Sequence, residues 1–257
     1  ALKNGDILYI RISSFNEDLS KNVEKEVNNA QKKLKNKLAG IVLDLRNNPG
    51  GLLEQAVNVS DLFLEQGEIV STRSRNVEDT IKYSASAGEI AKGLPIVVII
   101  NEGSASAAEI LAGALQDHHR AVIIGEKSFG KGSVQTLSPL PNGGGMRLTT
   151  ARYYTPSGRS IQAKGIEPDI EVKLAKVEEV EDTGWNISEA DLKGALKNEQ
   201  ADKKKNDNKN SDKLSDEDKK DYQLIRALDL VKALYLYGQN DNKNVLNLSE
   251  PVKKGKK

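Results

Sequence analysis

The feature that most constrains the fold is an alternation of apolar and amphipathic runs between residues 95 and 135. Residues 96–100 (IVVII) are all β-branched, and the run has the length of a buried strand. After a short turn, the pattern over 107–116 places apolar residues on one stripe and predicts a helix. A second apolar run, 121–124, predicts the next strand. A chain that alternates in this way is expected to form an α/β fold.

The same alternation continues on both sides of this stretch. We expect further strands at 6–12, 40–45, 68–72, 136–140, 146–154 and 166–172, and helices at 18–38 and 52–64. The tight turn at 141–145 makes a β-hairpin of the two strands that flank it. Residues 73–92 are polar and weakly patterned, and we interpret them as a hairpin or an irregular excursion.

The composition changes near residue 176, which suggests four parts of the chain. Residues 1–175 are expected to form the core. Residues 176–220 are rich in Lys, Asp, Glu and Asn, and they cannot bury enough apolar surface to order themselves, so they are expected to be a flexible linker. Residues 221–238 carry an apolar stripe that predicts a helix docked on the core, with Gly238 ending it. Residues 239–257 form a polar and basic tail.

Composition excludes several classes of function. A formal net charge of +1 gives no reason to expect nucleic acid or a membrane surface as a partner. The chain has no cysteine and only two histidines, which are adjacent, so neither a metal site nor a cofactor is expected. No apolar run approaches the ~18 residues of a membrane span, and no signal peptide is visible.

The turn before the predicted helix at 107–116 suits a nucleophile. Ser106 stands where unpaired N–H groups of a helix start can stabilise an oxyanion. The histidines, His118 and His119, lie about 15 Å away at the far end of that helix, too far to be its base. Lys131 can act as the base if burial removes water from its amine and lowers its pKa. Its flanking glycines and the nearby Phe129 fit a desolvated loop. Two other interpretations stay open: Ser104 is a competing nucleophile, and Ser106 with Glu109 also matches a helix capping box.

Three motifs resemble the Ser/Lys carboxy-terminal processing peptidases, also called tail-specific proteases. They are DLRNNPGG at 44–51, SASAAEILAGALQD at 104–117 and GEKSFGKGSVQ at 125–135. The resemblance extends over about residues 6–172. It implies that Ser106 is the nucleophile, that Lys131, 25 residues later, is the base, and that Gln135 orients the lysine. It also implies that the N–H groups of Gly51 and Ala107 form the oxyanion hole.

The resemblance further implies a β-sheet core flanked by helices, related to the crotonase and Clp-protease superfamily, with a C-terminal helix after the linker. The implied function is a serine endopeptidase that cleaves near protein C-termini through an acyl-enzyme. Its partners would be proteins or peptides with exposed C-termini, with a homo-oligomer as a further expectation. The implied location is the periplasm or the outer face of the inner membrane.

Members of this family usually carry a PDZ domain before the strand expected at 6–12. No segment of this chain matches one, so the chain is expected to be the catalytic part alone. Two other functions remain open from the residues: a crotonase-like enzyme acting on acyl-CoA thioesters, which also uses paired N–H groups, and a binding scaffold with a silent site.

Overall fold

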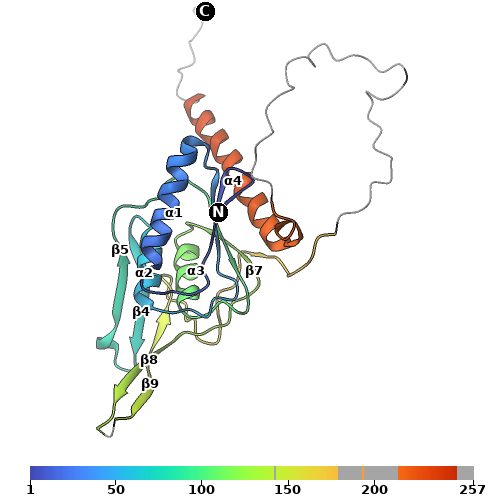
Figure 1. Cartoon of the computed structure of the whole chain (residues 1–257). Helices are drawn as coiled ribbons and strands as arrows, with labels where there is room; N and C mark the ends of the chain where they lie inside the picture. Colours follow the sequence, from blue (N-terminus) through green and yellow to red (C-terminus); the bar gives the residue numbers. More distant parts are fainter. Residues whose placement is uncertain (142, 179–192, 194–213, 248–257) are drawn as a thin grey trace, which may run out of the picture.

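The computed structural model contains two sheets, and helices cover both faces of the larger one (Figure 1). It describes residues 1–141, 143–178, 193 and 214–247. The larger sheet is parallel except for its first strand. In order across that sheet, its strands are β1 (Leu2–Lys3), β2 (Ile7–Arg11), β3 (Gly40–Asp44), β6 (Ile96–Ile100), β7 (Val122–Gly125) and β10 (Ile170–Glu171).

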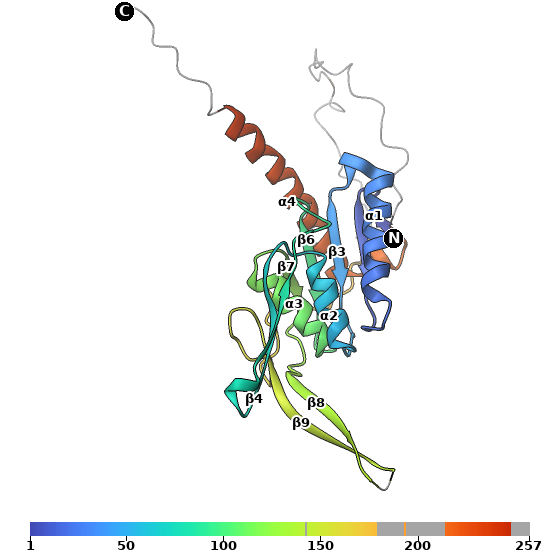
Figure 2. The same cartoon turned by 90° about the vertical axis from the view of Figure 1, so that its left-hand side faces the viewer.

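The smaller sheet is antiparallel throughout. In order, its strands are β5 (Ile81–Ala85), β4 (Gly67–Ser74), β9 (Gly145–Tyr154) and β8 (Ser133–Pro139). The segment 73–92, interpreted as a hairpin or an irregular excursion, supplies β5, which forms a hairpin with β4. The hairpin expected around 141–145 is the β8–β9 ribbon, and Figure 2 shows it projecting away from the larger sheet.

The central strands of the larger sheet are apolar on both faces because each face is covered. Side chains alternate along a strand, so Ile41 and Leu43 of β3 enter one core while Val42 enters the other. The first core is closed by α1 (Leu19–Leu34), α2 (Leu53–Asp61) and α3 (Ala107–Asp117). The second is closed by α4 (Tyr222–Asn247). The expected α/β fold, a sheet flanked by helices, is confirmed.

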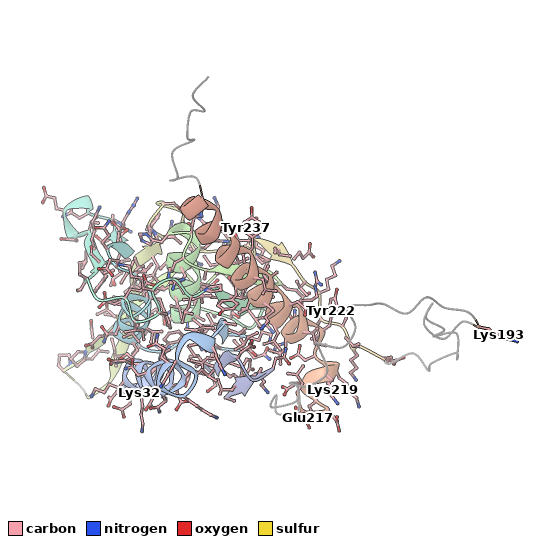
Figure 3. All side chains as sticks on the ribbon, turned by 90° about the horizontal axis from the view of Figure 1, so that it is seen from above. Lys32, Lys193, Glu217, Lys219, Tyr222 and Tyr237 are labelled. Atoms are coloured by element: carbon pink, nitrogen blue, oxygen red, sulfur yellow. The ribbon has the colours of Figure 1, made fainter. Side chains whose placement is uncertain are left out.

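Helix α4 packs on the sheet through one stripe, and Figure 3 shows Tyr222 and Tyr237 along its course. Its buried side chains are Leu224, Ala227, Leu228 and Val231. The prediction that Gly238 ends the helix is wrong, since α4 continues to Asn247. Gly238 does not have the positive φ of a C-cap glycine. Inside a helix, a glycine costs only about 1 kcal/mol relative to alanine, which neighbouring helical residues can offset.

Several other boundaries differ from expectation. The helix expected at 18–38 ends at Leu34, followed by the short 3-10 helix η1 (Lys35–Lys37), because Lys35 has a positive φ. The strand expected at 166–172 shrinks to the two residues of β10. Two more 3-10 helices are η2 (Val77–Asp79) and η5 (Asp218–Lys220). Most of the expected linker, 179–192 and 194–213, and the tail 248–257 lie outside the described residues. None of the helices described has the length and apolarity to cross a membrane.

Candidate active site

Ser106 lies in the turn that joins β6 to α3, directly before the first residue of the helix. Its φ of +56° and ψ of −114° define a backbone conformation that residues other than glycine rarely adopt. The side chain is half-buried. The first N–H groups of α3 have no acceptor within the helix, and they follow this residue. Such strained residues cluster at active sites, which makes Ser106 a candidate nucleophile.

Ser104 has a different environment, although only one residue separates the two serines. It is fully buried, and its hydroxyl donates a 2.8 Å hydrogen bond to the carbonyl oxygen of Leu45. The same Oγ accepts the N–H of Asn101 at 3.0 Å. Its hydroxyl is therefore occupied within the turn. This geometry favours Ser106 over Ser104 as the reactive serine.

The glycine loop after β3 lies against Ser106. A Cβ atom on Gly50 would stand 2.8 Å from the Cβ of Ser106 and 3.1 Å from the backbone nitrogen of Ala107. Gly50 also has a φ of +103°, so both space and backbone conformation require glycine here. Within the described part of the chain, the N–H groups of Gly51 and Ala107 donate no hydrogen bond. Unpaired donors beside a serine are what an oxyanion hole requires.

Asn48 holds this loop in place, and it is fully buried. Its side-chain amide donates to the carbonyl oxygen of Ile12 at 2.7 Å, and its Oδ1 accepts the N–H of Gly50 at 2.8 Å. Its own carbonyl oxygen accepts the N–H of Ala105, beside the candidate nucleophile, at 2.8 Å. Asn48 thus joins the end of β2, the glycine loop and the serine turn into one unit.

Lys131 follows β7 in a loop whose backbone is tightly packed. A Cβ on Gly132 would stand 2.3 Å from the backbone nitrogen of Gln162, which leaves no room beside the chain. The lysine side chain is nevertheless exposed. Among the described residues, its amine makes no hydrogen bond or ion pair, including none with Ser106. The expectation of a desolvated lysine is wrong for this structure, because the apolar neighbour Phe129 is itself 67% exposed.

Gln135 lies on β8, opposite Thr149 of β9. Its side chain is exposed and shares no hydrogen bond with Lys131 among the residues described. Lys131 precedes β8, and the pairing of β8 with β9 shifts register between Val134 and Gln135, so strand alternation does not place the two side chains on one side. In the described residues, the two side chains are not joined by a hydrogen bond.

A cleft of about 590 Å³ opens between the serine turn and the lysine loop. Its lining residues are Asn47, Pro49, Glu102, Gly103, Ala105, Phe129 and Lys131. Asn47 is held by Asn101, since the amide of Asn101 donates to the Oδ1 of Asn47 at 3.0 Å and the Oδ1 of Asn101 accepts the N–H of Asn47 at 2.8 Å. The cleft is open to solvent, and it contains the predicted base and the residue before the candidate nucleophile.

The two histidines lie at the opposite end of α3 from Ser106. His118 contacts the carbonyl oxygen of Glu68 through Nε2 at 2.7 Å. His119 occupies the turn after the helix, with a φ of +52°. Since α3 has 11 residues, its length of about 16 Å separates both imidazoles from the serine. No group of three or more His, Cys, Asp or Glu suited to a metal ion occurs among the described residues.

A buried ionic network supports the loop from the other face of the sheet. Burial opposes the ionisation of Asp44, but hydrogen bonds and charge from Arg46 outweigh it and lower the pKa of Asp44. Arg46 also donates to Asp221, at the start of α4, at 2.8 Å. Burial, with the charge of Asp44, raises the pKa of Tyr9 to about 12. The glycine motif is therefore linked to α4.

Sequence reasoning assigned no role to Asn48 or Arg46 and only a capping role to Glu109, whose Oε2 accepts the backbone N–H groups of both Ser106 and Lys131. The capping box expected for Ser106 and Glu109 is present, but the contact of Glu109 with Lys131 was missed. Glu109 is a single carboxylate in an otherwise apolar helical stretch, 107–115, and that contrast is the signal. Asn48 and Arg46 lie inside the DLRNNPGG motif without an assigned role. Nothing local in the sequence indicates the contact between Arg46 and Asp221, which are 175 residues apart.

Comparisons with known proteins agree with this geometry. The sequence model of peptidase family S41 matches residues 6–172. A carboxy-terminal-processing protease of Bartonella bacilliformis is 52% identical over 197 residues, which are 76% of this chain and 45% of that protein. A carboxyl-terminal-processing protease of Synechocystis sp. is 47% identical over 162 residues, which are 63% of this chain and 36% of that protein.

A solved structure is also similar. The photosystem II D1 C-terminal processing protease has 38% sequence identity and a TM-score of 0.60, over 65% of this chain and 42% of that one. The chain therefore spans less than half the length of each of these three relatives.

Proposed function

This chain belongs to peptidase family S41, and from that premise we propose that it is a serine endopeptidase that cleaves protein chains near their C-termini. The observation that carries the proposal is the environment of Ser106. A strained serine stands at a helix start, beside the unpaired N–H groups of Gly51 and Ala107. This is the arrangement that acyl transfer requires.

In the proposed reaction, the Ser106 hydroxyl attacks the carbonyl carbon of the scissile peptide bond, and Lys131 takes the hydroxyl proton. The resulting oxyanion accepts hydrogen bonds from the N–H groups of Gly51 and Ala107. Collapse of the tetrahedral intermediate breaks the C–N bond, and Lys131 returns the proton to the leaving amine. Water then attacks the acyl-enzyme by the same steps and releases Ser106.

This mechanism requires a rearrangement around Lys131. Lysine amines in water are protonated at neutral pH, whereas a base must be neutral, and loss of water favours the neutral form. Lys131 is exposed and does not contact Ser106. We propose that a bound substrate, or a domain outside this chain, covers the cleft and moves the amine towards the hydroxyl. Gln135 then orients it.

Partners and location follow from the same relationship. The substrates are proposed to be proteins or peptides with exposed C-termini, and the names of the relatives as C-terminal processing proteases support this. A PDZ domain elsewhere in the protein, assembly into a homo-oligomer, and export to the periplasm or the outer face of the inner membrane are proposals from the family resemblance alone.

A silent binding scaffold is the second candidate, and one observation favours it. The amine of Lys131 is exposed and makes no hydrogen bond with Ser106, so the dyad is not assembled in this structure. The acyl-CoA alternative has less support, since the matched relatives are named as proteases.

Labelling of the active serine tests the proposal directly. The full chain is treated with a fluorophosphonate, and the modified residue is mapped by peptide mass spectrometry. We expect label on Ser106, loss of label in Ser106→Ala, and retained label in Ser104→Ala. Melting is measured beside labelling, because removing a serine at a helix start can cost ~0.5–2 kcal/mol. Label on Ser104, or no label on Ser106 in the folded full-length protein, contradicts the proposal.

A further inference from the structure

Glu109 is a fully buried carboxylate between the two loops that carry the proposed dyad. Its Oε2 accepts the backbone N–H of Ser106 at 2.8 Å and the backbone N–H of Lys131 at 2.8 Å. Its Oε1 accepts the N–H of Gly130 at 2.6 Å and the hydroxyl of Ser128 at 2.6 Å. One carboxylate therefore holds the backbones of both the proposed nucleophile and the proposed base.

The four bonds show how this carboxylate is accommodated. Three of the donors are backbone N–H groups, which cannot accept a hydrogen bond. Glu109 is therefore an acceptor in these bonds, as an ionised carboxylate is. It has no ion pair with a Lys, Arg or His side chain in the described part of the molecule. A buried charge without such a partner depends on its hydrogen bonds, and those to a charged group are the strong ones.

The lysine loop is held from its other side as well. The Ser128 hydroxyl, while it donates to Glu109, accepts the N–H of Ile166 at 2.7 Å. A Cβ on Gly165 would stand 2.6 Å from the carbonyl oxygen of Ser128. The loop backbone is thus enclosed between Glu109 and residues 165–166. The side chains of Lys127, Phe129 and Lys131 remain exposed.

We infer that Glu109 is a positioning residue that sets where the Lys131 backbone stands relative to Ser106. The inference rests on the proposed function. A single oxygen, Oε2, bonds both backbones, so any shift of the lysine loop strains the bond to the serine turn. The same bond stabilises the unfavourable φ of Ser106. Glu109 does not touch substrate and does not exchange a proton.

The test is the rate of fluorophosphonate labelling of Ser106 in the full chain as a function of pH, for the wild type and Glu109→Gln. Glutamine keeps the shape but turns one acceptor into an NH₂ donor, so at least one loop N–H loses its partner. We expect labelling to slow about ten- to hundredfold. The acid limb should also move to higher pH. The proposed closure removes water from the lysine amine, and a loosened loop closes less completely, which favours the protonated form.

Glu89→Gln is the matched control, since this carboxylate pairs with Arg120 at 2.6 Å far from the cleft. It should lose stability yet keep the labelling rate of its folded fraction and the wild-type pH midpoint. If Glu109→Gln does not fold, Ser128→Ala replaces it, with Ser60→Ala, another buried hydroxyl, as its control. Ser128→Ala should shift the pH midpoint in the same direction by less.

Three outcomes overturn the inference. A folded Glu109→Gln or Ser128→Ala chain with the wild-type rate and pH midpoint assigns Glu109 to stability alone. The same holds if labelling falls only in proportion to the folded fraction, as in the Glu89→Gln control. A wild-type chain that takes no label on Ser106 overturns the proposed function, and this inference with it.

Discussion

The two halves of the candidate site differ in how completely the fold prepares them. On the serine side, Ser106, Gly50 and Asn48 are locked by buried hydrogen bonds and close backbone contact. On the lysine side, the backbone is equally fixed, but the side chains of Lys131 and Gln135 extend into solvent at the base of the β8–β9 ribbon. The oxyanion half is preorganised, and the base half is not.

This difference has a physical origin. Backbone N–H donors at a helix start are positioned by the helix and the sheet beneath it, so folding alone assembles them. A lysine amine on four rotatable bonds is stabilised in water, and folding alone does not bring it to a serine. Desolvation therefore has to come from whatever covers the cleft. Folding alone thus arranges the serine half, whereas the proposed role of the lysine half depends on occupation of the cleft.

Replacing Lys131 should produce the largest effect. Lys131→Ala removes the proposed base, and we expect peptide cleavage by the full-length protein to fall by about 10²–10⁴-fold, the usual contribution of a general base. Lys131→Arg should be equally inactive, because guanidinium does not lose its proton in this range. Cleavage rate against pH is the measurement. Activity that persists in Lys131→Ala removes lysine as the base and reopens the case for His118 or His119.

The next largest effect is expected in the free energy of unfolding, which should respond differently to substitutions on the two sides of the site. Ile110 of α3 is 2% exposed behind the serine, whereas Leu137 on the ribbon is 68% exposed. Ile110→Ala should lower the free energy of unfolding by about 2–5 kcal/mol, and Leu137→Ala should change it by less than ~0.5 kcal/mol. Urea denaturation of both variants gives the comparison. A large loss in Leu137→Ala means that the ribbon is covered in solution.

Acid should weaken the network behind the serine half by a smaller amount. Arg46 holds the folded-state pKa of the buried Asp44 below its ordinary value. Its contribution is therefore present above the unfolded pKa of about 4 and is lost as pH falls through the folded value. Urea midpoints measured from pH 6 to pH 3 should decline, and the decline should be shallower in Asp44→Asn. An identical decline in both proteins excludes Asp44 as its source.

The smallest effect is expected at Gln135, which does not contact Lys131 in this structure. If it orients the amine only after closure, Gln135→Ala should slow cleavage about two- to tenfold, the worth of one neutral hydrogen bond. Gln135→Glu should be slower still near neutral pH, because a carboxylate favours the protonated lysine. A Gln135→Glu variant faster than Gln135→Ala at pH 7 contradicts the orienting role.

Sequence reasoning placed Ser106 at the turn between a strand and a helix, where the structure has it, because the signals for that turn are local. The apolar run of β6 followed by the amphipathic pattern of α3 places Ser106 at a strand-to-helix turn. The carboxyl ends of neighbouring parallel strands share one edge of a sheet, so the glycine loop after β3 meets that turn. Sequence reasoning did not predict that the Lys131 side chain is exposed. The flanking glycines constrain the backbone of the loop and carry no information about where the lysine side chain lies.

By itself, the sequence determined the α/β alternation, the serine turn and the glycine loop, because hydrophobic period and turn chemistry act over a few residues. Tertiary structure alone decided three things: that Glu109 bonds both the serine turn and the lysine loop, that Arg46 meets Asp221 directly before α4, and that α4 runs beyond Gly238. The first two depend on where strands and helices far apart in the chain come to lie. The third depends on the summed helix propensity of the neighbouring residues, which outweighs the cost of one glycine.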